Sequence, residues 1–206
     1  IALASAGMGI LFSLLSLGYP VSAVKTLSNL NRPWLSREML FTIIYFCLLL
    51  IVSILQFRFP QKVRSFKWLL DAAALVGLLL IYVMSQVYCL ASIPAWNSIF
   101  TPADFFLAAL LFGSAFTLLF QLTNGSLACQ KALALLIMLL SVIQIILIPI
   151  HLTWLGSGTE PAHQQCVRML LDQYYVAFYL RLGLEILTVA FGFWAFLSIR
   201  SETLKR

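Results

Sequence analysis

The sequence predicts an all-helical protein that crosses a membrane several times. Of its 206 residues, 62% are hydrophobic and only 10% are charged, and the mean hydropathy is +1.00. A soluble domain of this composition would lack the polar side chains needed to cover its surface. The apolar residues form long runs instead of alternating with polar ones, which favours transmembrane helices over the strands of a membrane barrel.

Six apolar runs are long enough to cross the roughly 30 Å hydrocarbon core of a bilayer, which takes about 20 helical residues. In chain order they are Ile1–Leu17, Met39–Phe57, Trp68–Leu90, Phe105–Leu122, Ala132–Leu152 and Tyr174–Ile199. The first begins without an initiator Met or a basic flank, unlike a signal peptide, so we expect at least one more helix upstream.

The segments between the runs are short. The longest predicted non-helical stretches are Gly18–Arg37 and Thr153–Val167, and neither is long enough to fold alone. With no internal repeat visible, residues 1–206 are predicted to form a single transmembrane domain.

The basic residues divide between the two sides of the predicted bundle. One side carries Arg58, Lys62, Arg64, Lys67, Lys131, Arg200, Lys205 and Arg206. The other carries fewer bases, Lys25, Arg32, Arg37 and Arg168, together with Glu38, Asp104, Glu160 and Asp172. By the positive-inside rule the first side is cytoplasmic. The net charge of +6 therefore reflects topology, and it does not indicate nucleic-acid binding.

Aromatic residues agree with this orientation. The predicted outer interface gathers Trp34, Trp96, Trp154, Tyr174 and Tyr175, in the manner of the aromatic belts that anchor membrane helices. The mixed charge and the loops of this face make it a candidate docking surface for a partner protein.

The sequence offers no ligands for a haem or a metal ion. Its two histidines, His151 and His163, lie near one helix end and in the following loop, so facing helices do not each supply one. The four cysteines are scattered without CxxC spacing, although Cys89 and Cys166 are a pair that could meet on an oxidising side. If electrons pass through this protein, an organic carrier must bring them.

Two charged residues inside the last run admit two interpretations. Arg181 and Glu185 are four residues apart and share a helix face, which suits either a structural ion pair or part of a proton path or ligand pocket. Small residues such as Gly77, Gly183 and Gly192 are predicted to allow close approach of neighbouring helices.

A second polar signal precedes the run that starts at Met39. Ser36 is placed to cap that helix, and Glu38 is expected in its first turn, where the helix dipole favours a negative charge. A carboxylate just under the outer interface is also what a quinol hydroxyl needs as a proton acceptor.

The segment Val87–Phe106, where one run ends and the next begins, is the one long segment that reads as a specific polar device. It contains two prolines, a tryptophan and several hydroxyl side chains, in the order Val87-Tyr88, Ile93-Pro94-Ala95-Trp96, Ser98, Thr101-Pro102 and Phe105-Phe106. Upstream stand Leu17-Gly18-Tyr19-Pro20 with Ala23, Leu30-Asn31-Arg32 and Leu35-Ser36-Arg37-Glu38. These two sets of motifs resemble the membrane anchor subunit family of bacterial dimethyl sulfoxide reductase. The resemblance covers roughly Leu15 to Phe106, whereas the remainder matches only in hydropathy and in an arginine at Arg181.

The resemblance implies an eight-helix anchor without haem or metal, of which one helix before Ile1 and one after Arg206 would lie outside this sequence. Such an anchor sits in the bacterial cytoplasmic membrane with its docking loops on the periplasmic side. It binds an iron–sulfur subunit with four [4Fe–4S] clusters and a molybdopterin catalytic subunit, oxidises menaquinol near its outer face, and passes the electrons to the nearest cluster.

The resemblance also suggests the quinol pocket. Glu38 falls on the family's acidic position and is the expected proton acceptor, and the pocket is expected to be bounded by Ser16, Tyr19, Arg32, Arg37, Glu38, Tyr88 and Trp96. One position departs from the family, because Ser16 stands where a histidine usually precedes the Leu-Gly-x-Pro turn.

Two other functions stay open on the sequence. Arg181 and Glu185 within the membrane, with prolines near helix ends, would suit a small transporter, although no inverted repeat or helix broken near mid-membrane is apparent. Because Ser16 replaces the family's usual histidine, the protein could also be a structural anchor without quinol chemistry.

Overall fold

The computed structural model describes residues 34–90, 93, 95–124, 126–158 and 161–204, together with Gly7 and Gly9. All regular structure in these residues is helical, as the sequence predicts. In chain order the elements are α3 (Trp34–Arg58), the 3₁₀ helix η1 (Pro60–Phe66), α4 (Lys67–Tyr88), α5 (Phe100–Asn124), α6 (Leu127–Gly156), α7 (Pro161–Asp172) and α8 (Tyr175–Leu204).

Five of these helices are long and apolar enough to cross a membrane, and they correspond to the last five predicted runs. The spans are Trp34–Arg58, Lys67–Tyr88, Phe100–Leu122, Leu127–Gly156 and Tyr175–Ser198. The first predicted run, Ile1–Leu17, lies almost wholly outside the described residues.

The helices begin earlier than hydropathy alone predicts. α3 starts at Trp34, not Met39, and α5 starts at Phe100, not Phe105. The polar residues of these first turns lower the local hydropathy, yet they remain helical because a first turn needs few internal hydrogen-bond partners. Pro102 is tolerated in the first turn of α5 for the same reason.

The prediction that Thr153–Val167 is non-helical is wrong. α6 continues to Gly156, and α7 begins at Pro161, a residue whose fixed φ suits the start of a helix. Within α7, Cys166, Val167 and Leu170 are only partly exposed and recur at helical spacing. The helix is short and amphipathic, so a search for long apolar runs does not find it.

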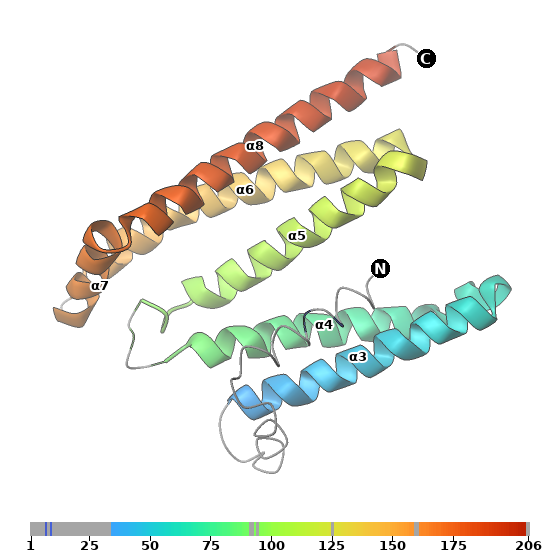
Figure 1. Ribbon diagram of the computed structural model, residues 1–206, viewed down its shortest axis with the longest axis horizontal. Helices are drawn as coiled ribbons and strands as arrows, with labels where there is room; N and C mark the ends of the chain where they lie inside the picture. The colour runs from blue at the N-terminus through green and yellow to red at the C-terminus, as the bar shows by residue number, and fades with distance from the viewer. Residues whose placement is uncertain are drawn as a thin grey trace. The chain divides into compact units, whose positions relative to one another are not determined.

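The protein divides into two compact units, Ile1–Tyr88 and Cys89–Arg206, which are described separately. In the first unit α3 and α4 pack side by side, joined by η1 (Figure 1). Their contact is close at Gly77, where an added Cβ would lie 3.1 Å from the Tyr45 ring. Gly77 therefore allows close helix approach, as its small size predicts.

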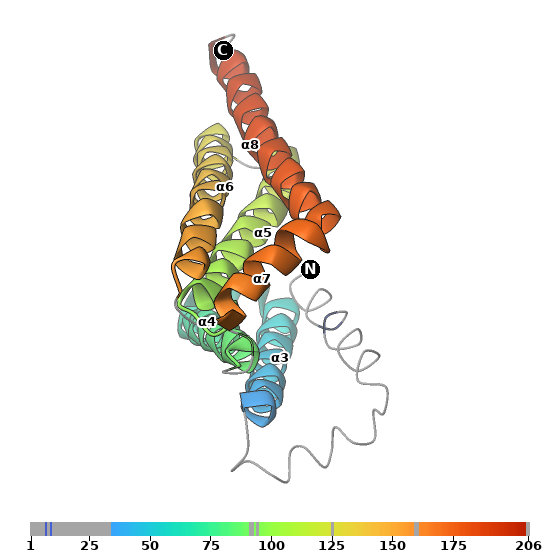
Figure 2. The same ribbon diagram turned by 90° about the vertical axis from the view of Figure 1, so that its left-hand side faces the viewer.

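In the second unit α6 contacts both α5 and α8 (Figures 1 and 2). The small core where they meet consists of Leu118, Ala134, Ile137 and Ala195. A hydrogen bond of 2.9 Å joins the hydroxyls of Thr188 on α8 and Ser141 on α6, and Ser141 is fully buried. α7 lies at the end of this unit where α6 ends and α8 begins, which we call the α7 end (Figure 1).

Most large apolar side chains of the spans are exposed, including Leu180, Leu184 and Leu187 on α8. Such surfaces are suited to contact with lipid or with further helices. All four cysteines carry free thiols, so Cys89 and Cys166 do not form the disulfide considered above.

Gly192 lies at a close approach between α6 and α8. A Cβ at this position would lie 3.3 Å from the Ala134 carbonyl oxygen and from two atoms of Met138. Gly183, on the same helix, has no neighbouring atom within 4 Å of such a Cβ, so the predicted packing role holds for Gly192 and is wrong for Gly183 in the described part of the protein.

We expect Gly192→Leu to lower the stability of the second unit by about 1–3 kcal/mol, because the larger side chain must separate α6 from α8. The measurement is the thermal unfolding midpoint of the purified protein in detergent. Gly183→Leu, a matched change on the same helix, should leave the midpoint nearly unchanged. Equal losses in the two variants would contradict this packing.

Candidate functional site

Each unit carries a group of polar and aromatic side chains at one end. In the first unit the group surrounds the start of α3, where the Arg37 guanidinium lies 4.7 Å from the Trp34 ring centroid. Trp34 in turn packs edge-on against Tyr82 of α4, with 6.3 Å between ring centroids. These contacts place the start of α3 beside the end of α4.

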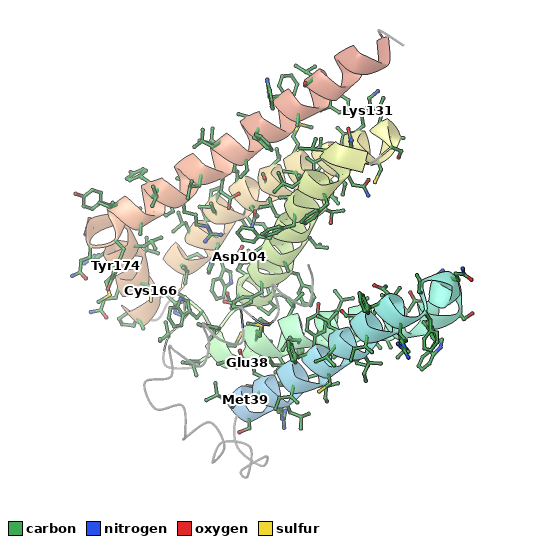
Figure 3. The ribbon with its side chains drawn as sticks, turned by 45° about the vertical axis from the view of Figure 1, so that its right-hand side comes forward. Glu38, Met39, Asp104, Lys131, Cys166 and Tyr174 are labelled. Atoms are coloured by element: carbon green, nitrogen blue, oxygen red, sulfur yellow. The ribbon has the colours of Figure 1, made fainter. Side chains whose placement is uncertain are left out.

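Glu38 lies near the start of α3 and is partly buried (Figure 3). Because α3 begins at Trp34, Ser36 is inside the first turn and Glu38 follows it, so the predicted capping position of Ser36 and first-turn position of Glu38 are wrong. Ser36 is buried, with 1% of its surface exposed. Glu38 is thus a carboxylate on an apolar helix. It lies beyond the first turn, whose free backbone N–H groups would otherwise stabilise its negative charge.

The structure brings together part of the predicted quinol pocket. Arg37 and Glu38 at the start of α3 share one end of the first unit with Tyr88, the last residue of α4. Ser16, Tyr19 and Arg32 lie outside the described residues. Trp96 belongs to the second unit.

The polar segment before α5 is a compact turn. The Trp96 N–H donates to the Ile93 carbonyl at 3.0 Å, and the Thr101 hydroxyl donates to the Trp96 carbonyl at 2.6 Å. The second bond ties the turn to the first turn of α5. The predicted runs placed both ends of Val87–Phe106 in helices, and in the structure α5 takes in more of the segment because it begins at Phe100.

An ion pair joins α5 to α8 near the α7 end. The Arg181 guanidinium lies 3.1 Å from the Asp104 carboxylate, with 46% and 33% of the two side chains exposed. Arg181 thus pairs with Asp104, which corrects the expectation of a pair with Glu185. Glu185 lies close enough to Arg181 and Asp104 for their charges to act on its carboxyl group. Figure 3 shows Asp104 in the half of the unit that holds Cys166 and Tyr174, away from Lys131.

Four aromatic rings gather at the α7 end of the second unit. Phe100 stacks on the imidazole of His151, with 4.5 Å between centroids and 15° between planes. Trp154 lies against both rings, at 5.9 Å and 6.1 Å. Trp154 also packs edge-on against His163 of α7, with 5.6 Å between ring centroids. The start of α5, the end of α6 and α7 thus share one cluster.

Sequence reasoning missed this cluster. It considered His151 only as a haem ligand, and Phe100 only as part of a loop. The one available signal was the presence of Trp154 and both histidines within a short stretch, but the contact with Phe100 joins residues far apart in the sequence. Among the described residues, no three His, Cys, Asp or Glu side chains come together as a metal site.

Comparison with known proteins gives a consistent result. A model of the family described as "DMSO reductase anchor subunit (DmsC)" matches residues 1–204. The protein is 34% identical over 116 residues to the C subunit of anaerobic dimethyl sulfoxide reductase from Haemophilus influenzae. It is 32% identical over 110 residues to YnfH, an anaerobic dimethyl sulfoxide reductase subunit of Escherichia coli K12.

These matches cover about half of this protein, 55% and 52%, but only 40% and 38% of the two relatives. No solved structure matches it significantly.

The Arg181–Asp104 pair should couple α5 and α8 energetically. In a double-mutant cycle with Asp104→Asn and Arg181→Gln, we expect the double variant to lose less stability than the sum of the single variants. A coupling of about 0.2–1 kcal/mol is expected for a pair this exposed, since solvent screens it. Unfolding midpoints in detergent measure the cycle. Strict additivity would indicate that the two charges do not interact.

Proposed function

The chain belongs to the family of DMSO reductase anchor subunits, and from that premise we propose that it anchors a reductase complex of this type in the membrane and oxidises quinol for it. The observation that carries the proposal is the family match over residues 1–204, on a protein whose described residues include five long apolar helices. The proposed partners are a four-cluster iron–sulfur subunit and a molybdopterin catalytic subunit. The proposed electron donor is menaquinol.

The proposed orientation in the bacterial cytoplasmic membrane follows from charge. Lys131 lies at the opposite end of the second unit from α7 (Figure 3), and the sequence places most other bases on the side of Lys131. By the positive-inside rule that side is cytoplasmic. The start of α3, the turn before α5 and α7 then face the periplasm, where the soluble partners dock.

Quinol oxidation releases two protons and two electrons per molecule. In the proposal the electrons pass to the nearest iron–sulfur cluster of the partner, and Glu38 accepts a proton from a ring hydroxyl. Three features support Glu38 in this role: its carboxylate is partly buried, it sits near the start of an apolar helix, and Arg37 and Trp34 lie beside it. Tyr88, at the same end of the unit, offers a hydroxyl for the ring.

Copurification tests the proposed assembly. The affinity-tagged protein, expressed from its native genomic setting, should bring down an iron–sulfur protein and a molybdopterin protein from solubilised membranes. A protein that isolates alone and transports a solute in vesicles would instead support the transporter interpretation.

We expect Glu38→Gln to lower quinol-dependent turnover of the complex by about 10²-fold, since the amide keeps the shape of the side chain and removes the base. A soluble reductant that feeds the partner subunits directly should still support the full rate. Asp71→Asn, which removes an exposed carboxylate from α4 of the same unit, is the control and should leave both rates unchanged. Full quinol-dependent activity in Glu38→Gln would remove Glu38 from the proposal.

Native cysteines allow the orientation to be measured. Cys166 on α7 and Cys129 in the first turn of α6 are both partly exposed free thiols. In variants that keep one of them and replace the other three cysteines with serine, a membrane-impermeant maleimide should label Cys166 in intact spheroplasts. Cys129 should react only after the membrane is permeabilised. The reverse pattern would invert the topology.

A further inference from the structure

The α7 end of the second unit holds buried polar atoms without a hydrogen-bond partner among the described residues, and two of them belong to His151 and Ser98. These two atoms are His151 Nε2 and Ser98 Oγ. A buried polar atom without a partner costs free energy, so such atoms are commonly satisfied by water or by a ligand. Two of them beside one aromatic cluster indicate a place where a polar group binds.

The two atoms belong to one neighbourhood. The backbone of Ala95 hydrogen-bonds the His151 imidazole, and Phe100 stacks on the same ring. Ser98 lies between Ala95 and Phe100 in the turn before α5. Residues on both sides of Ser98 therefore contact His151. Trp154 packs against these rings and has 42% of its surface exposed, so the cluster reaches the protein surface at this ring.

The hydrogen bond to Ala95 determines what His151 can bind. Since Nε2 has no partner, the bond is made by Nδ1, and a backbone carbonyl accepts only from a protonated nitrogen. In the neutral imidazole this leaves Nε2 without a proton, as a hydrogen-bond acceptor. The matching group on a ligand must therefore be a donor, such as a hydroxyl, and a bare carbonyl would not serve.

The surroundings limit the ligand further. The rings of Phe100 and Trp154 favour a flat, apolar molecule, since aromatic rings pack by stacking or edge contacts. The cluster stands at the end of membrane-spanning helices, so it is reached by molecules dissolved in the bilayer. Asp104 and Arg181 act electrostatically on His151 but neutralise one another as an ion pair, so a charged ligand is not favoured.

We propose that the α7 end of the second unit is a binding site for the reduced form of a quinone, in which a ring hydroxyl donates to His151 Nε2 and Ser98 Oγ bonds the same oxygen. The quinone form has only carbonyl oxygens there and binds more weakly. This inference rests on the proposed function for its ligand, but it involves neither Glu38 nor the other residues around the start of α3.

The test compares the binding of two probes that have the same aromatic ring at the same oxidation level. The measurements use the purified complex under anaerobic conditions. One is 2,3-dimethyl-1,4-naphthohydroquinone, which has two hydroxyl donors, and the other is its dimethyl ether, which has the same ring and no donor. Equilibrium dialysis gives the affinity and the stoichiometry for each probe. We expect the unsubstituted complex to bind the hydroquinone about 10-fold more tightly than the ether, the effect of one good hydrogen bond at this site.

His151→Phe keeps a ring against Phe100 and removes the acceptor. It should abolish one equivalent of hydroquinone binding or weaken it about 10-fold, while binding of the ether stays unchanged. Ser98→Ala, a smaller change in the turn, should weaken hydroquinone binding about 2- to 10-fold. Tyr174→Phe is the matched control, because it removes an exposed hydroxyl at the α7 end, and it should have no effect.

The outcomes separate this inference from the proposed function. If the hydroquinone binds the unsubstituted complex but both His151→Phe and Ser98→Ala bind it equally well, the two buried atoms are merely hydrated and this site is refuted, while quinol oxidation elsewhere in the protein stands. If no saturable hydroquinone binding occurs at all, the proposed function fails and this site fails with it. If His151→Phe does not assemble, the result for Ser98→Ala decides.

Discussion

The structure depends on one constraint, that backbone polar groups have no water to bond inside a bilayer. Helices satisfy these groups within each segment, and every span in the described residues is a helix of 22 residues or more. The same constraint governs side chains. Hydroxyls within the spans bond to carbonyls of their own helix, as Ser114 does to Leu110 at 2.7 Å, or across a helix contact, as Thr188 does to Ser141. Polar groups in the spans are therefore generally satisfied locally.

Against that background the α7 end of the second unit is exceptional. An ion pair, a histidine and an aromatic cluster meet there, and His151 and Ser98 keep buried atoms without partners in the described residues. Natural proteins leave such atoms unsatisfied mainly where water or a ligand completes the site. The first unit shows a related pattern at the start of α3, where Glu38 lies on an apolar helix beside Arg37. Polar chemistry is thus concentrated at helix ends, where the proposed exchange of electrons with a soluble partner would take place.

The sequence predicted the helical class and all five spans of the described residues, because hydropathy over about 20 residues reports directly on burial in lipid. Helix ends were less accurate, since the first turns of α3 and α5 contain polar residues. Hydropathy did not predict the helix α7, because it is short and amphipathic and contains no long apolar run. Side-chain partners could not be predicted: Arg181 has Glu185 four residues away, yet it pairs with Asp104, 77 residues away in the sequence. Similarly, Gly183 and Gly192 look alike in sequence, and only Gly192 lies against a neighbouring helix. Such choices depend on helix rotation and neighbours, which no local pattern encodes.

We propose that this protein delivers electrons from quinol to an iron–sulfur partner. Electron paramagnetic resonance of the purified complex tests it directly, because reduced [4Fe–4S] clusters are paramagnetic and the quinol is not. Adding a menaquinol analogue under anaerobic conditions should produce the cluster signal within the time of turnover, and the same addition to partner subunits without this anchor should not. Clusters that are reduced by dithionite in the complete complex but never by the quinol analogue would contradict the account.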